Sequence, residues 1–181
     1  AFFLPDFPVD AEVKYKDNLM NAYDNSIRYT DNFLARIIHL LKQQQVDASM
    51  LYTSDHGEDI FDDGRHLFLH ASPVPSYYQL HVPLLLWTSD SYREEYPGIE
   101  KAASMNRQKN ISSSISFFQT MMELAGIETP YRNDSLSVTS PLYTEKSRVY
   151  LNDHNEPHSL DDIGMRKEDF EMLKKRGIDA Q

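Results

Sequence analysis

The sequence lacks several features that would point to particular protein classes. None of its 181 residues is cysteine, which excludes a disulfide framework and thiol chemistry but favours no cellular compartment. No apolar stretch approaches the length needed to cross a bilayer, and no internal repeat or low-complexity segment is present. What remains is an ordinary globular composition, 40% hydrophobic and 25% charged, long enough for one domain with a hydrophobic core.

Basic residues are also scarce. The chain has 18 Lys and Arg against 28 Asp and Glu, which gives a formal net charge of −10. Non-specific nucleic-acid binding needs a basic surface, so we expect no nucleic-acid partner. A phosphorylated substrate is not excluded, because a bound metal ion would reverse the local field.

The first residues have the character of a chain interior. Residues 1–5 include two adjacent phenylalanines, and consecutive exposed aromatics at a terminus would lower solubility. We therefore expect residues 1–181 to be part of a longer protein, and the domain they form to be incomplete.

Apolar spacing and turn residues predict an α/β fold, with a mostly parallel or mixed sheet flanked by helices. Helix followed by strand, with short connections, is typical of layered α/β structure. Ser89–Asn106 is polar and is broken into two short pieces at Pro97-Gly98, and Ile127–Tyr143 is turn-rich. The other predicted elements are helices at Tyr15–Gln44, Asn110–Ala125 (with Asn110 as N-cap) and Arg166–Arg176, strands at Ser49–Ser54, His81–Thr88 and Ser147–Leu151, and a long, mostly irregular loop at Gly57–Gln79.

A polar group follows directly after the first predicted strand. Ser54-Asp55-His56-Gly57 comes where that strand ends, and the glycine permits a sharp turn. Carboxylate and imidazole groups are good ligands for zinc or manganese, and strand ends are where α/β folds usually bind ligands. Ser-Asp-His-Gly is equally good turn chemistry, so these residues alone leave both a metal site and a plain turn open.

The motifs around this turn narrow the choice, because their combination is more specific than any one of them. Together they resemble the alkaline phosphatase/sulfatase superfamily, and within it the bacterial phosphoethanolamine transferases that modify lipid A and related glycans. The resemblance covers about Tyr15–Gly126. It rests on Ser54-Asp55-His56-Gly57-Glu58, Leu69-His70, the run from Gln79-Leu80-His81-Val82-Pro83 to Trp87, and the upstream segment Tyr23–Asp31.

The resemblance implies an alkaline-phosphatase-like domain with one or two divalent metals. Such enzymes transfer a phosphoryl or sulfuryl group through a covalent intermediate on threonine, serine or a modified cysteine. It implies that Asp55 and His56 are metal ligands, with zinc as the expected metal and manganese or calcium as alternatives. The nucleophile and a further carboxylate ligand lie earlier in the family's chain, so we expect no nucleophile here. Thr30 and Thr53 are poor substitutes, because they fall on a helix and on a buried strand.

Further site residues follow from the same resemblance. His70 corresponds to the histidine that meets the phosphate or a second metal, so it is the expected catalytic residue. Glu58 is expected to hydrogen-bond a ligand, since metal-bound imidazoles usually have such a partner. Arg65, His66 and His81 are candidates for supporting ligands or binding substrate. The alternatives are an exposed loop position for His66 and packing at a strand entrance for His81.

Two other polar groups are interpreted as solvated loops. Asp59, Asp62 and Asp63 lack the alternation and the closing glutamate of a calcium-binding loop. His154 and His158 have the i, i+4 spacing of a helical metal pair, but Pro157 argues against a helix there.

The function implied by the resemblance is metal-dependent transfer of phosphoethanolamine from a phospholipid donor to a lipid A or glycan acceptor. It also implies a site at the periplasmic face of the inner membrane, with a membrane anchor and the N-terminal half of the catalytic domain upstream. A sulfatase or phosphodiesterase-type hydrolase of the same superfamily is one alternative, and a non-catalytic metal-binding module is another. Asp-His-Gly-Glu followed by Leu-His favours the transferase. We expect this chain alone to be catalytically silent.

Overall fold

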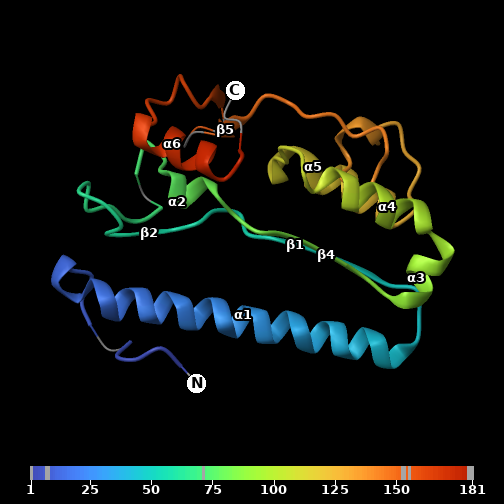
Figure 1. Cartoon of the computed structure of the whole chain (residues 1–181), viewed down its shortest axis with the longest axis horizontal. Helices are drawn as coiled ribbons and strands as arrows, with labels where there is room; N and C mark the ends of the chain where they lie inside the picture. The colour runs from blue at the N-terminus through green and yellow to red at the C-terminus, as the bar shows by residue number, and fades with distance from the viewer. Residues whose placement is uncertain (1, 7–8, 71, 152–153, 155, 179–181) are drawn as a thin grey trace.

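The elements of the chain form layers around one long strand pair (Figure 1), and the computed structural model describes residues 2–6, 9–70, 72–151, 154 and 156–178. The helices are α1 (Lys16–Gln44), α2 (Tyr77–Leu80), α3 (Asp90–Glu95), α4 (Pro97–Asn106), α5 (Ser113–Leu124) and α6 (Lys167–Lys175), with 3₁₀ turns η1 (Val13–Tyr15) and η2 (Asp134–Leu136). The strands are β1 (Ser49–Thr53), β2 (Asp59–Ile60), β3 (Phe68–Leu69), β4 (Leu84–Thr88), β5 (Val149–Leu151) and β6 (Pro157–Ser159).

Strands β1 and β4 form the central pair. They run antiparallel, with Met50 opposite Trp87 and Tyr52 opposite Leu85. Helix α1 lies along one side of this pair, and α5 lies on the other side and contacts β1 (Figure 1). The predicted α/β layering is therefore present, with helices on both sides of the strands.

The strands of the described residues do not form the mostly parallel or mixed sheet that the sequence predicted. The pairs β1–β4, β2–β3 and β5–β6 are all antiparallel. A parallel neighbour needs a crossover that carries the chain to the opposite end of the first strand. Here each connection returns the chain at the end where the previous strand stopped. The connection from β1 to β4 therefore starts and finishes at the same end of the strand pair, and the candidate site lies in this connection.

Helix α1 closely follows its prediction, because its apolar periodicity is long and local. It ends where Gln45 adopts a left-handed backbone conformation (φ 53°), a common helix terminator. None of its residues is fully buried, and Ile27, Phe33 and Leu40 are more than half exposed. Packing on β1–β4 therefore leaves much of the helix's apolar surface in contact with solvent.

The main apolar core lies between α2 and the C-terminal segment. Its buried members are Tyr77, Leu160, Met165 and Leu173, with Phe170 and other residues of α6 packed against them. Helix α2 belongs to the connection between β1 and β4, so the core joins the C-terminal segment to that connection. α6 lies over α2 in Figure 1.

Several local predictions need correction. Helix α5 begins at Ser113, after Ser112, and not at an Asn110 cap. The Asn110 backbone N–H donates to the Glu145 carboxylate at 2.5 Å. The polar stretch after β4 forms helices α3 and α4, divided at Pro97 as the sequence indicated. Ser89 starts α3 by accepting a hydrogen bond from the Tyr92 backbone N–H, which is ordinary N-cap chemistry.

The loop predictions were also too simple. The long connection at residues 57–79 contains β2, β3 and most of α2. β5 confirms the strand predicted at Ser147–Leu151, but His158 lies on its partner β6 and not in a loop. The exposed His154 lies in a turn, so the two histidines do not form a helical metal pair. Among the described residues, no helix is both long and apolar enough to span a membrane.

Candidate metal centre

The turn after β1 is held by backbone contacts that require glycine. We call Ser54–Glu58 the metal-centre turn. The Ser54 hydroxyl donates to the His56 carbonyl at 2.8 Å, and the Gly57 backbone N–H donates to the Gln79 carbonyl at 2.8 Å. A Cβ atom on Gly57 would lie 2.0 Å from the Tyr78 carbonyl oxygen, so no larger residue fits without moving the backbone.

Asp55 and His56 place a carboxylate beside an imidazole nitrogen. Asp55 Oδ2 lies 3.6 Å from His56 Nε2, and the Asp55 side chain is 86% exposed. The His56 backbone N–H donates to Asp55 Oδ1 at 3.1 Å, and this backbone bond lowers the pKa of Asp55. The carboxylate is therefore ionised at neutral pH, as a metal ligand must be.

The tautomer of His56 follows from its partner. His56 Nδ1 lies 3.0 Å from the Gly57 carbonyl oxygen, which can only accept a hydrogen bond. The proton therefore belongs on Nδ1, and the lone pair of Nε2 faces the Asp55 carboxylate. Metal-binding histidines commonly donate their other ring N–H to a carbonyl in this way.

Glu58 and His70 form a second pair next to the first. His70 Nδ1 lies 3.0 and 3.1 Å from the two carboxylate oxygens of Glu58, so Nδ1–H donates to them. The rings of His56 and His70 are 3.8 Å apart between centroids, and His56 Nδ1 is 3.8 Å from Glu58 Oε1. His56, Glu58 and His70 each offer a ligand atom within 4.8 Å of the others. With Asp55, which lies 3.6 Å from His56, four side chains of the types that bind metal ions lie together here.

The pairing of β2 with β3 brings His70 back to the turn. Asp59 is opposite Leu69, so Glu58 before β2 and His70 after β3 lie at the same end of the strand pair. Phe61, His66 and Leu69 have left-handed φ values of 55°, 53° and 61°. Such backbone strain costs about 1–3 kcal/mol per residue and clusters at functional sites.

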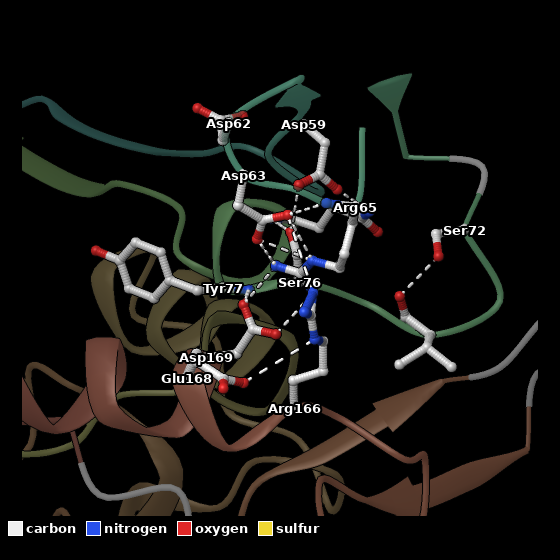
Figure 2. Close-up of polar contacts among 12 residues, drawn as sticks. Asp59, Asp62, Asp63, Arg65, Ser72, Ser76, Tyr77, Arg166, Glu168 and Asp169 are labelled. Carbon is white, nitrogen blue, oxygen red and sulfur yellow. Dashed lines mark hydrogen bonds and ion pairs between the residues drawn. The ribbon is translucent and has the colours of Figure 1, made fainter. Parts of the chain in front are cut away.

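The remaining sequence candidates lie apart from this group. The Arg65 guanidinium is 14% exposed and pairs with Asp63 and Asp169, so its hydrogen bonds go to neither metal-ligand candidate (Figure 2). His66 is exposed, which agrees with the alternative interpretation of this histidine as an exposed loop residue. His81 stacks on Tyr77 with its Nδ1 3.0 Å from the tyrosine hydroxyl, and burial lowers the pKa of His81. It lies at the entrance to β4 and also lines a cavity together with Glu58, so its role in binding substrate stays a prediction.

A cavity adjoins the metal-ligating group. Its volume is about 250 Å³, and its walls come from α1, from the residues of the metal-centre turn and β2, and from α2. Glu58 borders both the cavity and His70, while Tyr23 and Asp24 form part of the α1 wall. Burial, followed by the charge of Glu58, raises the pKa of Tyr23. The group thus opens onto a space large enough for a small polar headgroup.

The acidic stretch after Glu58 is not the solvated loop that the sequence predicted. Asp59 is buried, and its carboxylate accepts hydrogen bonds from the Ser76 hydroxyl at 2.8 Å and from the Gln79 side-chain amide. Burial raises the pKa of Asp59. Sequence reasoning missed this anchor and also missed Asp169, because their partners lie far along the chain.

Comparison with known proteins identifies the class. A family model described as Sulfatase matches residues 2–127, and the chain belongs to the sulfatase family. The phosphoethanolamine transferase EptA of Escherichia coli K12 is 35% identical over 120 residues, which are 64% of this chain and 22% of that protein. The chain thus spans about a fifth of the length of this curated relative.

Solved structures agree with this assignment. The C-terminal periplasmic domain of the phosphoethanolamine transferase EptC from Campylobacter jejuni has a TM-score of 0.67 at 28% identity, covering 80% of this chain and 45% of that one. The C-terminal periplasmic domain of EptC from E. coli in complex with zinc has a TM-score of 0.63 at 24% identity, covering 85% and 43%. The resemblance to phosphoethanolamine transferases and the alkaline-phosphatase-like fold class are confirmed.

Proposed function

We propose that this chain supplies part of the metal centre of a phosphoethanolamine transferase. The enzyme would move phosphoethanolamine from a phospholipid donor to a lipid A or glycan acceptor at the periplasmic face of the inner membrane. The observation that carries the proposal is the convergence of Asp55, His56, Glu58 and His70 at the end of β1, in a chain of the sulfatase family.

The donor set fits zinc. Zinc binds imidazole nitrogen and carboxylate oxygen at about 2.0–2.2 Å, whereas calcium takes six to eight oxygen ligands. We assign Asp55 and His56 Nε2 as the ligands from this chain, because these atoms face one another and the Gly57 carbonyl fixes the His56 tautomer. When bound, zinc would favour deprotonation of a nucleophile and stabilise charge on the transferred group.

The other pair would serve the substrate. Glu58 accepts Nδ1–H of His70 and so orients the ring, which leaves Nε2 of His70 to donate a hydrogen bond to an oxygen of the transferred phosphoryl group. The adjoining cavity of about 250 Å³ would receive the rest of the headgroup.

A segment outside this chain would complete the site with a threonine nucleophile and a further carboxylate ligand. Thr53 is unsuited to act as the nucleophile, because its hydroxyl donates to the Pro83 carbonyl at 2.9 Å. Thr30 is unsuited as well, because it lies on α1. The half-exposed apolar residues of α1, such as Ile27 and Phe33, offer a surface on which such a segment would pack.

The test is a transfer assay on the complete protein in membranes. Phosphatidylethanolamine is supplied as donor, and lipid A is examined for the added mass of one phosphoethanolamine group. We expect transfer by the wild type and none by Asp55→Ala. The matched control Asp47→Ala changes an exposed aspartate at the opposite end of β1 and should transfer normally. Metal-dependent ester hydrolysis without transfer would support the hydrolase alternative, and full activity of Asp55→Ala would contradict the proposed centre.

A further inference from the structure

The carboxylate of Asp169 links the C-terminal helix to the connection that carries the metal-centre turn. Asp169 lies on α6, beyond the residues matched by the family model, and its side chain is only 1% exposed. Arg65 Nη1 donates to Oδ2 at 2.7 Å and Arg65 Nη2 donates to Oδ1 at 2.9 Å. The Tyr77 backbone N–H also donates to Oδ1, at 2.9 Å. Figure 2 shows Asp169 between these two partners.

Arg65 extends the same contact into the loop between β2 and β3. Its Nε donates to both carboxylate oxygens of Asp63, at 3.0 and 2.9 Å, and Asp63 also lies 4.0 Å from Arg166 Nη1 at the start of α6. We call Asp63, Arg65 and Asp169 the Arg65 bridge. The planar guanidinium has its donors committed to two carboxylates, a geometry that a lysine ammonium cannot reproduce. The bridge therefore fixes both the distance and the orientation of the loop relative to α6.

A continuous series of contacts leads from Asp169 to the metal-ligating group. Tyr77 is the first residue of α2, and the Gln79 carbonyl in α2 accepts the Gly57 backbone N–H at 2.8 Å. The side chains of Ser76 and Gln79 both donate to the buried carboxylate of Asp59. Gly57 and Asp59 are the two chain neighbours of Glu58, so α2 holds Glu58 from both sides.

The same contacts extend to His70. Asp59 pairs with Leu69 across β2 and β3, and His70 follows Leu69 directly. Holding Asp59 therefore holds the backbone next to both members of the Glu58–His70 pair. The pair itself is less buried than Asp59, since the His70 side chain is 52% exposed and that of Glu58 is 20% exposed.

We infer that Asp169 and Arg65 are positioning residues that set the geometry of the metal-ligating group through α2. The C-terminal segment beyond the family-model match would then be a functional part of the site. The expected change in zinc affinity rests on the proposed function, whereas the expected change in hydrogen exchange of residues 57–70 does not depend on zinc. Substitution of groups that orient metal ligands typically lowers metal affinity 10- to 100-fold, and we expect the lower end of that range for this more remote contact.

The test compares isosteric variants in the complete protein. Asp169→Asn keeps an oxygen that can accept the Tyr77 N–H but presents an amide N–H₂ to Arg65. Glu168→Gln is the matched control, because Glu168 is the preceding residue on α6, is 76% exposed and pairs only loosely with Arg166 at 4.0 Å. The double variant Arg65→Met with Asp169→Asn removes the buried cation as well, so no buried charge is left unpaired, and the carboxylate that loses its partner, Asp63, is 38% exposed. Thermal unfolding and circular dichroism verify the fold of each variant.

Three measurements are made on the folded variants. Zinc affinity is measured by competition with a chromophoric chelator, ligand geometry by the visible spectrum of the Co²⁺-loaded protein, and loop order by hydrogen exchange of residues 57–70. Asp169→Asn and the double variant should each bind zinc about 10-fold more weakly, with an altered cobalt spectrum and faster exchange in 57–70 but not in α1. Glu168→Gln should match the wild type in all three.

The outcomes separate the two proposals. The positioning role would be overturned if folded Asp169→Asn matched the wild type in zinc affinity, in cobalt spectrum and in hydrogen exchange. If Asp169→Asn does not fold, the double variant decides by the same criteria. If the wild type binds no zinc, the proposed function fails, and exchange in 57–70 alone then decides the positioning role. Unchanged exchange in the variant would overturn that role as well.

Discussion

The metal-centre turn and the Arg65 bridge contain similar groups in opposite environments. At the turn, Asp55 is 86% exposed and its carboxylate faces an imidazole lone pair. In the bridge, Asp169 is 1% exposed and each of its oxygens accepts a hydrogen bond from Arg65. A site that binds a cation must keep donor atoms available, whereas a structural ion pair must use all of them. Exposure and hydrogen-bond saturation, more than residue type, therefore separate ligand from anchor in this chain.

The largest effect should come from removing the buried anchor. Asp169→Ala leaves the Arg65 guanidinium without its buried partner, so we expect the free energy of unfolding to fall by about 3–5 kcal/mol. Urea unfolding measures the loss. Glu168→Ala, on the exposed face of the same helix, should change it by less than about 0.5 kcal/mol. Equal losses in the two variants would mean that the bridge contributes no stability.

Removing a group at the open site should instead reduce activity and spare the fold. His70→Ala is expected to lower the transfer rate about 10²- to 10³-fold, since it removes a donor to the charge on the transferred group. Zinc content and the unfolding curve should not change. The control is His66→Ala, an exposed histidine of the same connection. A transfer rate like that of the wild type in His70→Ala would remove His70 from the mechanism.

A smaller effect should come from the glycine that connects the two regions. Gly57→Ala places a methyl group 2.0 Å from the Tyr78 carbonyl oxygen, so the backbone between the turn and α2 must move. Such overpacking typically costs about 1–3 kcal/mol, which urea unfolding would detect. Gly64→Ala is the matched control, because nothing lies within 4 Å of its added Cβ. If the two variants unfold alike, the close approach of Gly57 to α2 is not a structural requirement.

The smallest effect concerns acid stability. Hydrogen bonds from Arg65 lower the pKa of Asp63 below the 3.8 of the free side chain. Because the folded pKa is the lower one, Asp63 stabilises the fold above pH 3.8 and loses this contribution as the pH falls through the folded pKa. Asp63 is over a third exposed, so its contribution is less than about 1 kcal/mol.

The acid effect is measured as a difference between two proteins. The unfolding free energies of wild type and Asp63→Asn should differ at neutral pH and converge below pH 3.8. Buried Asp59 has the opposite shift in both proteins, so it cancels in the comparison. If the difference in unfolding free energy between the two proteins stays constant from neutral pH to below pH 3.8, the ion pair does not lower the pKa of Asp63.

The parts of the fold that were predictable from sequence are those determined locally. The 29-residue helix α1 has a long apolar period, and β1 ends at a turn whose chemistry is contained in adjacent residues. The Asn110 cap was wrong, since α5 begins only at Ser113, and the Asn110 backbone N–H contacts Glu145, 35 residues away. β2, β3 and α2 are too short to show a period, and tertiary contacts stabilise them.

The candidate site divides in the same way. Asp55, His56 and Glu58 are near neighbours in a recognisable motif, and the structure places His70 beside them through the β2–β3 pair. Glu58 was expected to support a metal ligand; it accepts a hydrogen bond from His70 at 3.0 Å, and His56 Nδ1 lies farther away at 3.8 Å. Arg65 and Asp169 are 104 residues apart, so no local pattern could have predicted their pairing or the anchoring of the turn.

The most direct test of the central claim is anomalous diffraction at the zinc edge from crystals of the complete protein. We predict one ion in contact with an Asp55 carboxylate oxygen and His56 Nε2, with the Glu58–His70 hydrogen bond preserved beside it. Zinc-saturated, active protein whose ion touches neither Asp55 nor His56 would contradict the account.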